Sequence, residues 1–251
     1  MNMKLLATLN VLALAGVLTT NALANILPIN GMNTGEVSAL YPSLFTPAGF
    51  TFSIWSVIYL LLIGFAMVQW KVLSKPYFTE LSLWFLLSSL ANVCWIFAWH
   101  YLFIYASVLI MLMLLFSLTK IFLLLQPIHI NSLTEKIFIK LPFIFYLSWI
   151  CVATIANTSA LFVSLSWDGG ILSPVTWTIM MISIASALGV YISWRFREPA
   201  FMIVLIWALF GIYSKWHGTE NNSIATTALA ELVMVGVLFF AFQFGLKKEV
   251  A

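Results

Sequence analysis

The chain consists almost entirely of long apolar runs separated by short polar connections. The runs cover residues 5–24, 51–70, 82–99, 102–125, 138–163, 173–194, 199–216 and 224–246, and 199–216 is the shortest. A helix that crosses the hydrocarbon core needs about 20 residues. Inside lipid the backbone must hydrogen-bond within its own segment, and the runs lack the alternation of barrel strands. The sequence therefore predicts an all-α, polytopic transmembrane bundle of about eight helices.

Composition points the same way, since 63% of the residues are hydrophobic and only 8% are charged. A soluble domain carries about 25% charged residues because its surface must face water. We therefore expect membrane lipid as the surrounding partner. The formal net charge is only +3, and its basic residues are scattered, which argues against a nucleic-acid partner.

The first run has two interpretations. Lys4, the apolar stretch and the small-residue ending Ala22-Leu23-Ala24 resemble a secretory signal peptide. The apolar stretch is long, however, and the charge pattern of the chain also fits a retained helix. Both interpretations stay open at this stage.

Basic residues fall on alternate connections. With eight spans, one side of the membrane receives the residues Lys4, Lys71, Lys75, Lys120, Lys136, Lys140, Arg195, Arg197, Lys247 and Lys248. Lys215 is the exception. The positive-inside rule makes the basic side cytoplasmic, which predicts a multi-pass protein of the cell (inner) membrane with both termini cytoplasmic. The external connection 25–50 is rich in Asn, Gly, Pro, Ser and Thr, and either caps the bundle or is a plain surface loop.

Residues that could carry chemistry are few. Motifs of hydrolases and metalloenzymes are absent, so we expect no enzyme and no metal site; His100, His129 and His217 are interpreted as polar residues near helix ends. Glu231 differs from the other acids because it lies well inside the last run, where a carboxylate is costly unless it is protonated, paired or hydrated. It is either a proton, cation or ligand site, or a protonated side chain bonded to a neighbouring helix.

Two amides and three tryptophans lie deep in the runs, namely Asn92, Asn157, Trp55, Trp95 and Trp149. An amide in hydrocarbon must find partners. It can bridge helices or orient a polar group of a ligand in a cavity lined by aromatic rings. The residue types alone do not decide between helix packing and a pocket.

Three stretches stand out for their tryptophans and amides: residues 47–59 (PAGFTFSIWSVIY), 91–95 (ANVCW) and 146–157 (YLSWICVATIAN). Together they resemble motifs of the TspO/MBR family of tryptophan-rich sensory or translocator proteins. They occur in the family's order, although Phe50 and Phe145 stand where the family usually has Trp and Pro. The resemblance implies a TspO/MBR-like five-helix membrane domain over 1–165. The remaining residues, 166–251, are then an additional three-helix membrane extension with no counterpart in the usual five-helix form.

The resemblance also implies a function. Such proteins bind porphyrins, haem or sterol-like molecules and have sensory or transport roles, and homodimers are common among them. Carried over by position, the ligand-binding candidates are Trp55, Asn92, Trp95, Trp149 and Asn157. No cofactor is required, and porphyrin or haem enters as a ligand.

Three functions follow from these observations. The first is a membrane sensor or binding protein for a flat apolar ligand, which could also aid its transport. The alternative is a proton-coupled secondary transporter of a small molecule that uses Glu231. A porphyrin-degrading enzyme is a minor third hypothesis, because the sequence offers no residues for its chemistry.

Overall fold

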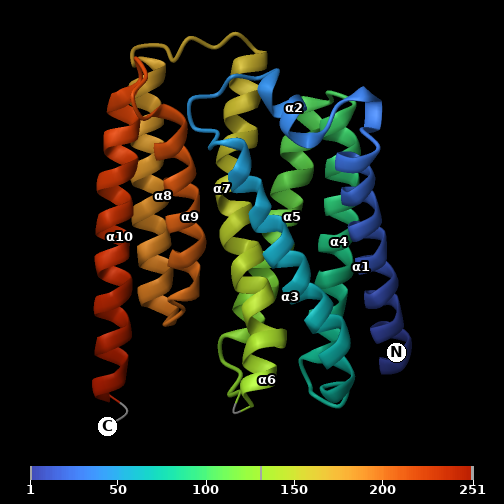
Figure 1. The fold of residues 1–251 in the computed structure, drawn as a ribbon. Helices are drawn as coiled ribbons and strands as arrows, with labels where there is room; N and C mark the ends of the chain where they lie inside the picture. Colours follow the sequence, from blue (N-terminus) through green and yellow to red (C-terminus); the bar gives the residue numbers. More distant parts are fainter. Residues whose placement is uncertain (1, 131, 250–251) are drawn as a thin grey trace. The chain divides into compact units, whose positions relative to one another are not determined.

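The computed structural model describes residues 2–130 and 132–249, and the regular secondary structure of that part is entirely helical (Figure 1). The α-helices are α1 (Met3–Ile26), α2 (Thr34–Ala39), α3 (Ile54–Val68), α4 (Phe78–His100), α5 (Ile104–Leu125), α6 (Leu133–Glu135), α7 (Leu141–Ser164), α8 (Pro174–Phe196), α9 (Ala200–Trp216) and α10 (Asn222–Glu249). Short 3₁₀ helices cover Ile29–Gly31, Gly49–Ser53 and Gln69–Lys71, and a π-helical turn, Lys136–Lys140, precedes α7.

The predicted fold class is confirmed. Seven helical segments in the described part are long and apolar enough to cross a membrane: Met3–Ile26, Gly49–Lys71, Phe78–His100, Ile104–Leu125, Leu133–Ser164, Pro174–Phe196 and Asn222–Gln243. The eighth predicted run forms α9, which has 17 residues. At 1.5 Å per residue α9 is about 25 Å long, close to the hydrocarbon thickness of about 30 Å. The chain is an integral, multi-pass membrane protein.

The structure divides into two compact units. Unit 1 comprises Met1–Tyr41 and Trp55–Ile150, and unit 2 comprises Pro42–Ile54 and Cys151–Ala251. The boundaries fall inside the first connection, at the start of α3 and inside α7. They differ from the predicted division at 165/166, which separates a family-like part from an extension rather than two compact bodies. That predicted domain boundary therefore stays a prediction.

In unit 1, α4 packs between α1 and α5. The rings of Phe65 of α3, Phe85 of α4 and Phe143 of α7 meet edge to face, with centroids 5.0–5.9 Å apart. Such aromatic pairs stabilise a packed interior beyond their area. Next to them, the ring of Phe138 lies so close to Gly64 that a Cβ there would collide with it. These contacts fix α3, α4 and the first half of α7 against one another.

Helix α1 is joined to unit 1 by polar side chains as well as by apolar packing. The Asn10 amide donates to Gln69 Oε1 at 2.9 Å and to Ser82 Oγ at 3.0 Å, and all three side chains are fully buried. An unpaired amide in such surroundings would be costly. Loss of α1 would therefore leave buried polar groups of α4 and of the 3₁₀ turn after α3 without their partners, which favours the retained-helix interpretation of the first run.

The first part of connection 25–50 covers the end of α4. A capping box between Asn33 and Glu36 starts α2. The His100 imidazole is completely buried there: its Nδ1 donates to the carbonyl of Ile29 at 3.1 Å, and its Nε2 lies 3.1 Å from Thr34 Oγ1. His100 is thus an internal hydrogen-bonding residue. It is the last residue of α4, as expected for a polar residue near a helix end, and the connection that folds back over the helix end buries it.

In unit 2, α8, α9 and α10 pack against one another (Figure 1). The segment 42–54, which precedes α3 in the chain, lies along α9. The Ala48 amide donates to the carbonyl of Gly211 at 3.1 Å, and the Trp207 indole donates to the carbonyl of Thr51 at 2.8 Å. A Cβ at Gly211 would collide with Thr51, so the glycine permits this close approach of segment and helix.

Candidate functional site

Four aromatic residues of the motif stretches meet in unit 1. The Trp55 ring contacts Tyr146 and Trp149 edge to face, with centroids 5.6 and 6.3 Å away, and stacks on Tyr59 at 5.4 Å. Trp149 is 1% exposed. The family-like positions on α3 and α7 therefore form one aromatic cluster, in which ring-to-ring packing occupies much of each surface.

Asn92 joins this cluster by hydrogen bonds. Its Nδ2 donates to the Tyr146 hydroxyl at 2.8 Å, and its Oδ1 accepts from the Asn21 amide of α1 at 2.8 Å. Asn92 and Tyr146 are buried. The amide thus links α1, α4 and α7, which is the helix-bridging role that the sequence left open beside ligand binding.

The other two predicted residues lie elsewhere. Trp95, one turn after Asn92 on α4, stacks on Trp99 with centroids 5.6 Å apart and planes 15° from parallel. Asn157 is buried in the half of α7 that belongs to unit 2. Trp55, Asn92 and Trp149 are therefore brought together within unit 1, and the ligand-binding role of all five residues stays a prediction.

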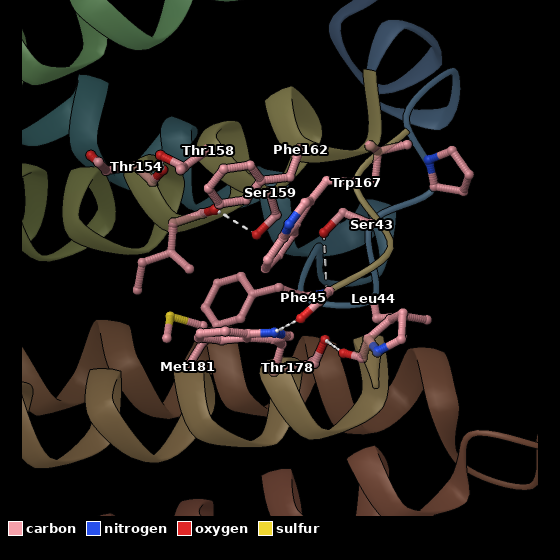
Figure 2. A pocket seen from close by; sticks show the side chains of 16 residues that line it. Ser43, Leu44, Phe45, Thr154, Thr158, Ser159, Phe162, Trp167, Thr178 and Met181 are labelled. Atoms are coloured by element: carbon pink, nitrogen blue, oxygen red, sulfur yellow. Dashed lines mark hydrogen bonds between the residues drawn. The ribbon is translucent and has the colours of Figure 1, made fainter. Parts of the chain in front are cut away.

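A large cavity lies within unit 2, between the second half of α7 and the first half of α8 (Figure 2). Its volume is about 630 Å³, inside the range of roughly 300–1,000 Å³ usual for small-molecule sites. We call it the α7–α8 cavity. It is lined by Pro42, Ser43, Leu44, Phe45, Thr154, Ile155, Thr158, Ser159, Phe162, Val163, Trp167, Gly169, Pro174, Trp177, Thr178 and Met181.

The loop between α7 and α8 forms one wall of the cavity. Asp168 Oδ1 accepts from the amide of Gly170 at 2.9 Å, and Gly169 and Gly170 have φ values of +93° and +65°, a region that glycine enters without strain. The Trp177 indole donates to the carbonyl of Gly169 at 2.7 Å, and its ring meets Trp167 at 5.5 Å between centroids. The loop is therefore held against the start of α8 with two indole rings at the cavity.

Residues 42–45 form another wall, and α9 holds them in place. Lys215 Nζ donates to the carbonyl of Thr46 at 2.8 Å and lies 3.4 Å from that of Ser43. The Trp216 indole donates to the carbonyl of Leu44 at 2.8 Å. Helix α9 thus positions part of the cavity without lining it.

Sequence reasoning missed the α7–α8 cavity. A signal was present on α7, where Thr154, Thr158 and Phe162 recur at four-residue spacing and share one face of the helix. Hydroxyls in line with an aromatic ring on one face of an apolar helix indicate a surface that is not simply lipid-facing. The contribution of Phe45 and its neighbours had no comparable signal, because their contacts reach about 170 residues along the chain.

Glu231 lies on α10 in unit 2, and its Oε2 is buried without a hydrogen-bond partner among the described residues. This oxygen therefore makes no bond to a neighbouring helix in the described part of the chain, and the role of Glu231 stays a prediction. On α8, the hydroxyls of Ser186 and Ser193 are buried and unpaired as well, so the three-helix part of unit 2 holds several unused polar groups. Within the part of the chain that is described, no three His, Cys, Asp or Glu side chains gather as metal ligands.

Comparison with known proteins supplies the family. A family model described as "TSPO-like protein" matches residues 7–241. Comparisons with curated proteins and with solved structures found no match. The matched region passes through α8, α9 and α10, beyond the 1–165 stretch on which the sequence resemblance rests. Since the match spans nearly the whole chain and agrees with the three motifs, the chain belongs to the family of TSPO-like proteins.

Proposed function

We propose that this TSPO-like membrane protein binds a flat, apolar small molecule of the porphyrin, haem or sterol-like class in the α7–α8 cavity, and that it acts as a sensor or aids transport of that ligand. The observation that carries the proposal is the cavity of about 630 Å³ with its aromatic lining. Family membership supports the ligand class. The protein acts by binding, not as an enzyme, and requires no cofactor.

The chemistry of the lining supports a flat apolar ligand. Phe162, Trp167 and Trp177 present rings from α7, the loop and α8, with neighbouring centroids 4.7 and 5.5 Å apart. Rings favour offset or edge-to-face contact with another aromatic or fused-ring body. Met181 adds a flexible apolar side chain, which adapts to irregular ligand shapes.

The setting in the cell is part of the same proposal. The basic asymmetry supports insertion into the cell (inner) membrane with both termini cytoplasmic. A homodimer is proposed from the family alone. The side chains of Lys247 and Lys248, which contribute to the asymmetry, lie outside the described part of the structure.

Cavity filling tests the proposal. Ser159 lines the cavity from α7, and Ser159→Phe places a ring in the empty volume. We expect affinity for a porphyrin or sterol probe, followed by quenching of Trp fluorescence in detergent-solubilised protein, to fall at least about tenfold, as for the loss of 1.4 kcal/mol of binding free energy. Ser164→Phe is the matched control, because Ser164 is exposed on the same helix and outside the lining. Equal affinity of both variants and the unchanged protein would refute the proposed site.

A second candidate function is proton-coupled transport through Glu231. The observation in its favour is the buried Oε2 without a partner among the described residues, because an unpaired intramembrane carboxyl group is costly to keep unless it has a role. This transporter hypothesis places the moving proton on α10, not in the α7–α8 cavity.

One substitution separates the two functions. Glu231→Gln keeps the shape of the side chain and cannot release a proton. Under the binding function, affinity for the probe stays within a few-fold; under the transporter function, pH-driven uptake into vesicles is abolished while binding survives. Glu220→Gln, at an exposed position in the connection before α10, is the control. Unchanged uptake in the Glu231 variant would remove this second candidate.

A further inference from the structure

The α7–α8 cavity has no ionisable lining residue among the 16 side chains that form it, since none is Asp, Glu, Lys, Arg or His. A second cavity of about 490 Å³, in unit 1, is different: its lining includes Lys75, Glu80, His129 and Glu135. Burying a charge without a partner is far more costly than burying a neutral polar group. The α7–α8 cavity therefore disfavours a ligand that carries its charge into the interior.

Three hydroxyls on the helical walls of the cavity already donate their protons to their own helices. Thr158 donates to the carbonyl of Thr154, Ser159 to that of Ile155, and Thr178 to that of Pro174, each at 2.8 Å. A hydroxyl has one proton and two lone pairs. With the proton bound to its own helix, each of these three oxygens offers a ligand only acceptor sites. They come from both helical walls, Thr158 and Ser159 from α7 and Thr178 from α8 (Figure 2).

The two indole N–H groups at the cavity differ in their hydrogen bonding. Trp177 has committed its N–H to the carbonyl of Gly169. The Trp167 N–H has no hydrogen-bond partner among the described residues, so the loop offers one donor at the edge of the cavity. The three oxygens on the helical walls thus accept from a ligand, whereas the Trp167 N–H and the hydroxyl of Ser43, whose oxygen accepts from the Phe45 amide, can donate to it.

From this arrangement we infer that the α7–α8 cavity selects a neutral, largely apolar ligand that carries hydroxyl or N–H donors, and that it discriminates against carboxylates. The inference rests on the proposed function and specifies the ligand class of the same site. Within the proposed classes it favours an alcohol over an acid. The ligand's donor meets the oxygens of Thr158, Ser159 or Thr178, while its fused rings lie against the aromatic side chains.

Two matched pairs of probes test the inference on the full chain in detergent. The first pair is cholesterol and its 3-methyl ether, which differ in one donor. One hydrogen bond corresponds to about a 2- to 10-fold difference in affinity, and we expect the alcohol to bind that much more tightly. The second pair is protoporphyrin IX and its dimethyl ester, for which we expect the neutral ester to bind more tightly than the acid.

Substitutions of cavity hydroxyls test whether the tighter binding of cholesterol than of its ether arises in the α7–α8 cavity. Val has nearly the shape of Thr and no hydroxyl, so Thr158→Val with Thr178→Val should reduce the advantage of cholesterol over its ether, with Ser159 as the remaining acceptor, and leave ether binding unchanged. Thr119→Val, on α5 in unit 1, is the control, because Thr119 also donates to its own helix, at 2.8 Å. A smaller advantage of cholesterol over its ether in the double variant than in the unchanged protein supports the inference.

The outcomes separate this inference from the function on which it rests. If the four probes bind and Ser159→Phe blocks them, the proposed function stands. The inference is then overturned if the ether equals the alcohol or if the free acid binds as tightly as its ester. If none of the four probes binds, the proposed function fails and the inference fails with it.

Discussion

Replacing Asn92 with Leu tests whether this motif residue bridges helices or contacts a ligand. Leu has a similar volume and makes no hydrogen bonds, so the substitution removes the bond to the Tyr146 hydroxyl and the bond from the Asn21 amide, both 2.8 Å long. The structure assigns Asn92 to a bridge, because both ends of its amide are occupied by protein groups. We therefore expect a loss of stability and little change in ligand affinity.

The magnitude follows from the two bonds. A side-chain hydrogen bond between membrane helices contributes about 0.6 kcal/mol on average and up to about 1.7 kcal/mol, so Asn92→Leu should cost about 1–3 kcal/mol. For a chain of this size each kcal/mol lowers the melting temperature by roughly 2–4 °C. The melting temperature in detergent, followed by circular dichroism, should thus fall by roughly 2–12 °C.

A double-mutant cycle isolates the bond itself. Tyr146→Phe removes the same hydroxyl, and the coupling energy with Asn92→Leu should be about 0.6 kcal/mol or more. Asn25→Leu, at an exposed position of α1, is the control and should leave the melting temperature unchanged. The reasoning is refuted if Asn92→Leu leaves stability intact while it lowers probe affinity tenfold, because Asn92 would then be a ligand contact.

Three further predictions concern unit 2 and the topology. Trp216→Phe removes the bond to the carbonyl of Leu44 and should weaken probe binding about 2- to 10-fold in fluorescence titrations. Trp194→Phe, which changes an exposed side chain, should leave probe binding unchanged. Equal effects of the two substitutions would contradict the inference that α9 positions residues 42–45 at the cavity. Gly169→Ala should destabilise the loop by about 1–3 kcal/mol in thermal unfolding. The loss should exceed that of Gly170→Ala, because a Cβ at Gly169 would meet the carbonyl of Leu172, whereas a Cβ at Gly170 has open space. A smaller loss at Gly169 than at Gly170 would contradict the described packing of the α7–α8 loop. A reporter fused after Asp168 should read as external, and a cytoplasmic signal would overturn the eight-span topology.

The helices were predictable because the length of an apolar run is set by the bilayer. The aromatic cluster was predictable only in part. Trp55 and Trp149, both named by the motifs, do meet in one cluster. Residue type could not reveal that Asn92 finds both of its partners on protein side chains, since these come from Asn21 and Tyr146, 71 and 54 residues away.

The α7–α8 cavity and the state of Glu231 were beyond sequence reasoning for related reasons. A cavity is the space that long-range packing leaves empty, and segment 42–45 reaches it only through its contacts with α9. For Glu231 the sequence indicated depth, and depth implied a partner by energetic argument. The structure leaves Oε2 without one among the described residues, which is the kind of local disagreement expected at a functional position.

The contacts of Lys215 bear on the number of spans. In an eight-span chain the first, fifth and seventh connections lie on one side of the membrane. Residues 42–45 of the first connection, and Trp167 and Gly169 of the fifth, line one cavity in unit 2. Lys215, near the seventh connection, donates to the carbonyls of Ser43 and Thr46. If the 17-residue α9 turned back without crossing, Lys215 would lie on the opposite side from those carbonyls. These contacts support the prediction that α9 crosses despite its length, and the bonds to the first connection give Lys215 a role that is separate from the basic asymmetry.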